Sequence, residues 1–151
     1  MIDMQATKTF LMVPPESNAS GAFSTNNILD TEGYNFLRVM VIAGAMAGDL
    51  GSGASGDAAI QLEEGDDDGL SDAADITGYN VPKMTSSDDN KIVAIDVPLG
   101  GRKRYIRIKA MQVGGTNVVG AIGIMSRAEQ SPNTKAKAGL HAWNVAGSAM
   151  A

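Results

Sequence analysis

Residues 102–111 read Arg-Lys-Arg-Tyr-Ile-Arg-Ile-Lys-Ala-Met, and this stretch decides the fold class. Charged or aromatic side chains alternate there with apolar ones, in the two sets Tyr105, Arg107 and Lys109, and Ile106, Ile108 and Ala110. A period of two residues predicts a β-strand with one face in a core. Residues 92–97 alternate in the same way. Residues 34–43 alternate at first and then become continuously apolar, which is typical of a central strand of a sandwich.

Other β-prone runs lie at 9–13, 23–29, 58–64 and 118–125, with a shorter element at 76–81. Pro14 and Pro15 are expected to end the first run, because proline has no N–H to donate to a strand ladder. The runs are separated by turns rich in Gly, Asp and Ser, and no stretch has a confident helical period. The pattern predicts about eight short strands in an all-β fold, an antiparallel β-sandwich of jelly-roll or Greek-key type. We expect this sandwich over residues 1–128 and an extended C-terminal arm over residues 129–151.

The composition excludes several classes of protein. The 151 residues include no cysteine, which rules out disulfides and Cys-ligated metals. The first residues lack the basic start and apolar run of a signal peptide, and the longest apolar stretch, 39–47, is too short to span a bilayer. We therefore expect a soluble protein that is made in the cytoplasm and has no membrane partner.

The net charge of -5 is distributed unevenly along the chain. Residues 1–100 carry 16 acidic and 4 basic side chains, whereas residues 101–151 carry 1 acidic and 8 basic ones. Such asymmetry indicates either a surface for a charged partner or a sandwich in which strands from both halves interleave. The basic cluster Arg102-Lys103-Arg104 lacks the surrounding aromatics of a nucleic-acid site. We expect these side chains to pair with acids on a neighbouring strand or subunit, and we expect no nucleic-acid partner.

No catalytic, cofactor-binding or metal-ligating residue is assigned. His141 is the only histidine and lies in the arm, so neither a catalytic triad nor a His-rich zinc site can be assembled. The acidic loop 64–75 has the spacing of an EF-hand, but Glu64 stands at its first position and Asp75 at its last, where Asp and a bidentate Glu are usual. A polar turn is the preferred interpretation. We expect no enzymatic activity, cofactor, metal or small-molecule substrate.

The arm is expected to order against a partner. It contains the only tryptophan, and tryptophan buries a large rigid area at interfaces. The expected partner-contact residues combine the arm with the basic cluster: Lys135, Lys137, Leu140, His141, Trp143, Val145, Arg102, Lys103 and Arg104.

The order of these features resembles the head-decoration, or cement, proteins of tailed bacteriophages. The pieces that carry the resemblance are Asp30-Thr31-Glu32-Gly33-Tyr34, Ile60-Gln61-Leu62-Glu63-Glu64, Ile95-Asp96-Val97, Lys103-Arg104-Tyr105-Ile106-Arg107 and Gly114-Gly115-Thr116. The likeness covers about residues 9–128. It implies a structural virion protein, a β-sandwich homotrimer on the outer capsid surface that bridges subunits of the major capsid protein. The alternative is a carbohydrate-binding or adhesion module on the virion surface, which a chain with one Trp, three Tyr and three Phe supplies poorly.

Overall fold

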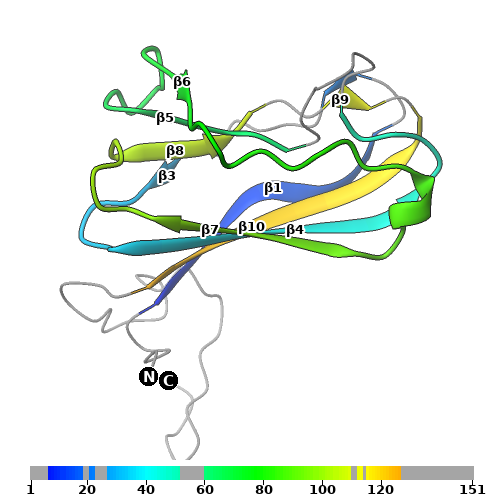
Figure 1. Ribbon diagram of the computed structural model, residues 1–151, viewed down its shortest axis with the longest axis horizontal. Coiled ribbons are helices and arrows are strands. Elements are labelled where there is room, and N and C mark those ends of the chain that lie inside the picture. Colours follow the sequence, from blue (N-terminus) through cyan, green and yellow to red (C-terminus); the bar gives the residue numbers. More distant parts are fainter. Residues whose placement is uncertain are drawn as a thin grey trace, which may run out of the picture.

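The computed structural model describes residues 7–18, 21–22, 27–51, 60–109, 112–113 and 115–126. In this part of the chain, two four-stranded antiparallel sheets lie face to face (Figure 1). The predicted antiparallel β-sandwich is therefore confirmed. The predicted domain boundary at residue 128, the arm at 129–151 and the start of the expected strand 23–29 lie outside the described residues.

The first sheet, here the long sheet, has the strand order β1-β10-β4-β7. Its strands are β1 (Lys8–Asn18), β10 (Asn117–Ser126), β4 (Phe36–Met46) and β7 (Ile92–Pro98). The second sheet, here the short sheet, has the order β3-β8-β5-β6. Its strands are β3 (Leu29–Asp30), β8 (Tyr105–Ile108), β5 (Leu62–Gly65) and β6 (Ala74–Asp75). A small pair joins β2 (Gly21–Ala22) to β9 (Gln112–Val113), and η2 (Ser86–Asp88) is a single 3₁₀ turn.

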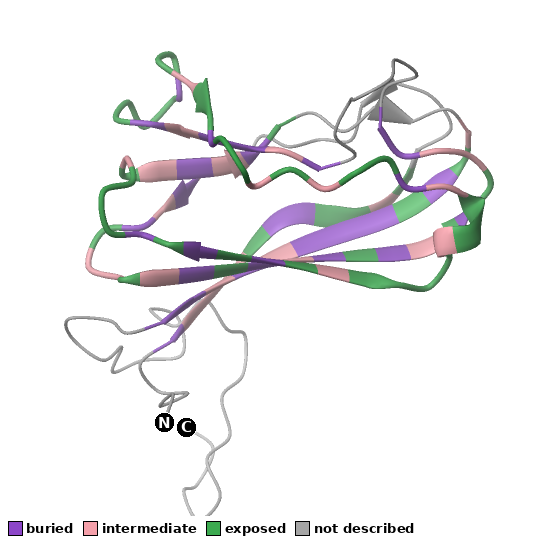
Figure 2. Cartoon of the chain, viewed as in Figure 1, coloured by how far each residue is buried: buried purple, intermediate pink, exposed green. Residues whose placement is uncertain are grey.

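The core lies between the two sheets. Strands of the long sheet alternate between buried and more exposed residues, which Figure 2 shows as changes of colour along each strand. The largest fully buried side chains come from both sheets and from the segments that join them: Met12, Leu29, Leu37, Leu50, Ile60, Leu62, Ile76, Ile106, Ile108 and Met125. Burial of these side chains from water is the main favourable contribution to folding.

Gly123 of β10 marks a point of close packing in this core. A Cβ built there would lie 3.1 Å from Met12 Sδ, 3.3 Å from Leu37 Cδ1 and 3.4 Å from Leu29 Cδ2. Side chains from β1, β4 and the short sheet therefore converge over a position that has none of its own. The absence of a side chain at residue 123 lets the two sheets interdigitate here.

The prediction that Pro14 and Pro15 end the first strand is wrong, because β1 continues through them to Asn18. The register of β1 against β10 shifts between Leu11 and Val13 and again between Val13 and Glu16. β1 is an edge strand, and edge positions and bulges are where a sheet tolerates proline. Pro15 also packs over β10, where a Cβ at Gly120 would lie 3.2 Å from it.

Other strand boundaries also differ from the prediction. The strand predicted at 102–111 starts later, as β8 at Tyr105, because the Lys103 N–H donates to the Glu64 carboxylate and the Arg102 N–H to the Leu99 carbonyl. Residues 110 and 111 of the predicted strand lie outside the described residues. Residues 58 and 59 of the strand predicted at 58–64 lie outside the described residues; from residue 60 onward, an isolated bridge between Ile60 and Val81 precedes β5, which begins at Leu62. The alternating strand predicted at 92–97 is confirmed as β7.

Candidate functional site

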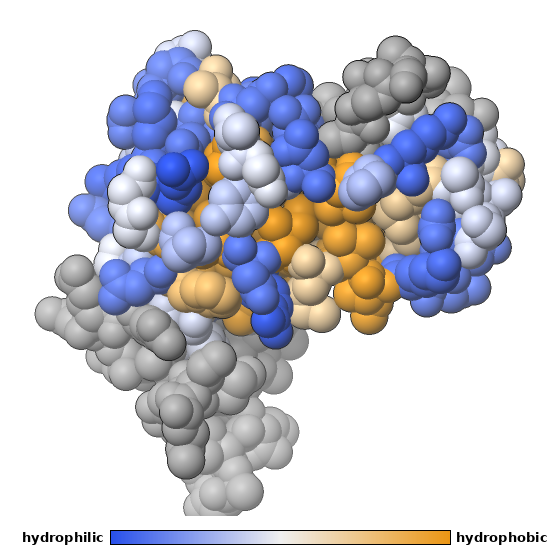
Figure 3. Space-filling view, in the orientation of Figure 1, coloured by the Kyte–Doolittle hydropathy of each residue, from blue (hydrophilic) through white to orange (hydrophobic). Residues whose placement is uncertain are grey.

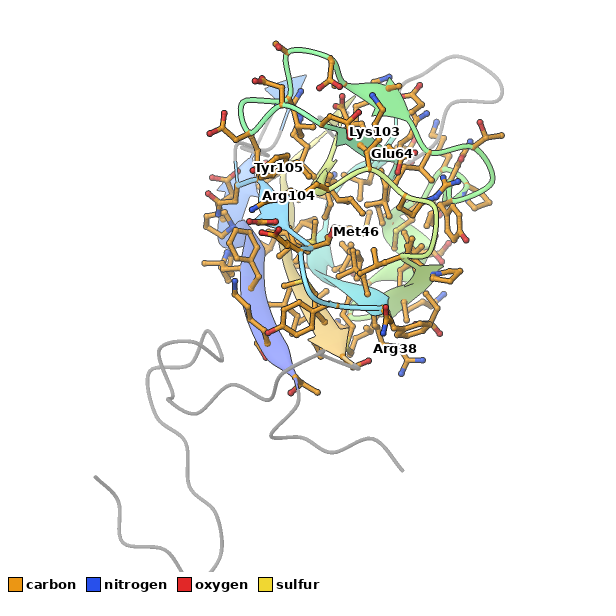
Figure 4. The ribbon with its side chains drawn as sticks, turned by 90° about the vertical axis from the view of Figure 1, so that its left-hand side faces the viewer. Arg38, Met46, Glu64, Lys103, Arg104 and Tyr105 are labelled. Carbon is orange, nitrogen blue, oxygen red and sulfur yellow. The ribbon has the colours of Figure 1, made fainter. Side chains whose placement is uncertain are left out.

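The predicted contact residues fall into two groups. Lys135, Lys137, Leu140, His141, Trp143 and Val145 lie outside the described residues. The remaining three, Arg102, Lys103 and Arg104, lie just before β8 at one end of the short sheet. Figure 4 shows Lys103 close to Glu64, and Arg104 next to Tyr105.

Each side chain of this basic cluster is paired with an acid of its own chain. Arg102 lies 3.3 Å from Glu64, and Lys103 Nζ lies 2.9 Å from Asp72. Arg104 donates two hydrogen bonds to the Asp30 carboxylate, at 2.9 and 2.8 Å. The expectation that these cations pair with acids on neighbouring segments is confirmed for contacts within the chain.

The same pairing continues along β8. Arg107 lies 3.4 Å from Glu63 of β5, and Lys109 lies 2.9 Å from Asp75 of β6. These cations come from the basic second part of the sequence and the acids from its acidic first part. The charge asymmetry of the sequence is therefore balanced in space on the short sheet, because strands from both parts interleave there.

The ion pairs hold several carboxyl groups in their charged form. The hydrogen bonds from Arg104 keep the pKa of Asp30 below its usual value. Asp72 accepts hydrogen bonds from the backbone N–H of Asp66, from Lys103 and from the backbone N–H of Asp67, and these lower its pKa strongly. On the long sheet, hydrogen bonds from Arg38 lower the pKa of Asp96.

The acidic loop 64–75 folds as a turn whose carboxylates serve its own backbone and the nearby cations. Asp72 bridges two backbone N–H groups and Lys103, and Asp67 accepts from the Ser71 N–H at 3.0 Å. Leu70 has φ 54° and buries its side chain beneath the turn. Among the described residues, no three Asp, Glu or His side chains are grouped as ligands for a metal ion.

The long sheet presents a different surface on the side that faces away from the core. Two rows of cross-strand neighbours make up this surface. The first row is Leu11, Ile122, Met40 and Ala94, and the second row is Gly120, Ile42 and Ile92. With Val118 of β10, we call these residues the outer apolar face. Ile42 is 46% exposed and Ile92 is 58% exposed. Figure 3 views the two sheets nearly edge-on, so the apolar residues at the centre of the view lie between the sheets, and the outer apolar face is not turned toward the viewer.

This face is unusual because the strands beneath it are apolar on both sides. In β4 the buried residues Val39 and Val41 alternate with Met40 and Ile42, which point outward. An antiparallel sheet with one solvated side normally carries polar residues on that side, and runs that are apolar on both faces are typical of strands covered on both faces. The Arg38–Asp96 ion pair occupies the next row and bounds the face.

The outer apolar face is not among the sites that the sequence pattern predicts. Its signal in the sequence is the continuously apolar second part of residues 34–43, a pattern that predicts a central strand but does not by itself show an exposed face. A similar run, Val118 to Met125, contains no polar side chain. The second apolar surface becomes visible only when the register places these runs side by side.

Comparisons with known proteins add a distant structural likeness. No family model matches the chain, and no curated protein matches it. One similar solved structure is the crystal structure of SPBc2 prophage-derived protein YomS, which is 12% identical, covers 80% of this chain and 92% of that chain, and superposes with a TM-score of 0.47. In the described part of the chain, no helix has the length and hydropathy to cross a membrane.

Proposed function

We propose that this chain is a structural, non-enzymatic protein of a tailed-phage virion, which binds the outer surface of the capsid and stabilises contacts between subunits of the major capsid protein. It would act as a homotrimer, assembled on the shell after synthesis in the host cytoplasm. The observation that carries the proposal is the outer apolar face, a surface suited to the contacts between copies that hold a multisubunit assembly together. The order of sequence features that resembles cement proteins supports the same role.

The chemistry of the short sheet supports a static role. Its charged side chains are held in cross-strand pairs such as Arg107 with Glu63 and Lys109 with Asp75. A general acid or base needs a pKa near the working pH, whereas the pKa shifts of Asp30 and Asp72 move further from neutrality. These groups are suited to holding strands together.

The aromatic residues weigh against the alternative of a sugar-binding module. Sugar platforms are exposed aromatic rings, whereas every aromatic side chain in the described ranges is only partly exposed, namely Phe10, Tyr34, Phe36, Tyr79 and Tyr105. Tyr105 is further engaged by Arg104, whose guanidinium lies 5.1 Å from the ring centroid. Binding on a glycan array would favour the alternative.

The proposal is tested by sedimentation with shells assembled from the major capsid protein of the phage that encodes this chain. The full-length protein is expected to co-sediment with the shells, to saturate at a fixed ratio, and to be displaced by an excess of unlabelled protein. Mass measurement in solution or on the decorated shell is expected to give a trimer. Failure to co-sediment would overturn the capsid role, and a monomer in both settings would overturn the trimer.

A further inference from the structure

We infer that the outer apolar face is the binding site for the C-terminal arm, residues 129–151, of a neighbouring copy of this chain. The inference deepens the proposed function, since it names the contact by which copies of the homotrimer hold one another. Its test needs no capsid, so it can fail or succeed independently of shell binding.

The face requires a cover. Leu11, Ile42 and Ile92 are each about half exposed, although they lie in adjacent rows across β1, β4 and β7. The opposite surface of the molecule, on the short sheet, carries paired charges instead. Strands that are apolar on both sides are typical of sheets that are covered on both faces. The contrast between the two sheets therefore selects the long sheet as the one that is covered.

The size of the face selects an arm over a second sheet. Four strands about 4.8 Å apart span about 14 Å, and rows two residues apart along a strand lie about 7 Å from one another. With half a spacing added on every side for the width of the side chains, the face measures on the order of 200–300 Å², whereas a stable interface between globular partners buries about 800 Å² on each side. Two such faces stacked on each other bury too little for a stable pair. A single extended segment of about six residues, roughly 20 Å long, matches the face.

The arm has a segment with the required spacing. Trp143 and Val145 are two residues apart, so an extended backbone places both side chains on one side, about 7 Å apart. That distance equals the spacing between the Met40 row and the Ile42 row, so Trp143 can cover one row while Val145 covers the other. Tryptophan buries a large area in a single side chain, which makes it a suitable anchor.

The length of the chain permits docking on a neighbour. β10 ends at Ser126, and Ile122 of the outer apolar face lies only four residues before it, at about 13 Å. Trp143 follows Ser126 by 17 residues, a reach of up to about 56 Å. This reach exceeds the length of the longest strands, 11 residues or roughly 37 Å. The arm can therefore cross to the same face of an adjacent copy, and three such contacts close a ring.

The first test uses Trp143, the only tryptophan, as a fluorescent reporter in the full-length protein. We expect its emission to shift to the blue as protein concentration rises. Ala94→Glu on the outer apolar face should raise the required concentration about tenfold or more, a change of about 1.4 kcal/mol. The matched control is Ala74→Glu, which also replaces an exposed alanine in an edge strand, but in the short sheet. Both variants are checked for folding by circular dichroism.

The second test exploits the absence of cysteine. Full-length proteins carrying either Ala94→Cys or Val145→Cys are mixed and oxidised, and the mixed disulfide is identified by mass spectrometry. We expect this product to form readily, and to be lost when Ala74→Cys replaces Ala94→Cys. Only a contact between two chains can form it, because each chain contains one thiol.

The outcomes separate the possible occupants. A double variant, Ala94→Cys/Val145→Cys, tests docking of the arm on its own chain. If a disulfide forms only in this variant and the blue shift does not depend on concentration, the arm folds onto its own chain and the inference is overturned. A blue shift unaffected by Ala94→Glu would place the arm elsewhere and also overturn it. Emission typical of exposed tryptophan at all concentrations would exclude arm docking. None of these results depends on whether the protein binds a shell.

Discussion

Two substitutions on one strand test the assignment of the two faces of the long sheet. Leu37 and Ile42 both belong to β4, but Leu37 is fully buried in the core beside Gly123, whereas Ile42 is 46% exposed. Changing either residue to alanine removes three carbon atoms. The chemical change is therefore matched, and only the surroundings of the side chain differ.

The expected losses differ by about 2 kcal/mol. At about 0.8 kcal/mol for each buried carbon, Leu37→Ala forfeits roughly 2.4 kcal/mol of transfer free energy. A residual cavity between the sheets raises the loss in unfolding free energy to about 3–4 kcal/mol. Ile42→Ala leaves no cavity, and with about half of the side chain already in water it should cost roughly 1.3 kcal/mol.

Urea unfolding of dilute protein, followed by circular dichroism, measures both values. With a slope of about 2 kcal/mol per molar urea, the midpoint should fall by about 1.5–2 M for Leu37→Ala and by about 0.6 M for Ile42→Ala. Equal shifts at every dilution would refute the reasoning, because Ile42 would then be covered within its own chain.

Three further predictions concern the charged short sheet and the arm. Folding lowers the pKa values of Asp30 and Asp72, so their contribution to stability is present above the unfolded value of 3.8 and is lost as the pH falls towards their folded values. The urea midpoint should therefore decrease as the pH is lowered through the acid range, and it should decrease less in the variant Asp72→Asn. Calorimetric titration with calcium should show no binding tighter than millimolar, because the acidic turn is engaged with its own backbone and with cations; micromolar affinity lost in Asp66→Ala/Asp68→Ala would contradict this. Truncation before Ser131 should leave the sandwich folded, since its last described strand ends earlier, and should weaken shell occupancy in sedimentation; undiminished occupancy would count against a role for the arm.

Much of the strand content could be predicted because it depends on local pattern. The alternation in residues 92–97 and in Tyr105 to Ile108 sets which side chains enter the core, and the structure bears out both. The two prolines of β1 misled the prediction, because their effect depends on whether the strand lies at an edge. Edge position is a property of the sheet order and cannot be derived from residues 9–15 alone.

The candidate site was harder to predict, because its residues meet only through long-range pairing. The outer apolar face joins Leu11, Met40, Ala94 and Ile122 through the registers of four strands. The partners of the basic cluster follow the same rule, since Arg104 meets Asp30 only when β8 pairs with β3. The sequence indicated that cations would find acids, but the identity of each pair depends on the topology.

The position of β10 has a consequence for synthesis of the protein. This strand lies between β1 and β4, where Lys8 pairs with Met125 and Phe36 with Ser126. Until residues 117–126 have left the ribosome, β1 and β4 lack their shared partner, and the long sheet cannot close. Contacts between such distant residues slow folding, and an apolar strand with an unpaired edge is prone to aggregate while it waits. The nascent chain is therefore most exposed to misassembly just before β10 emerges, and a chaperone that shields β4 at that stage should raise the yield of folded protein.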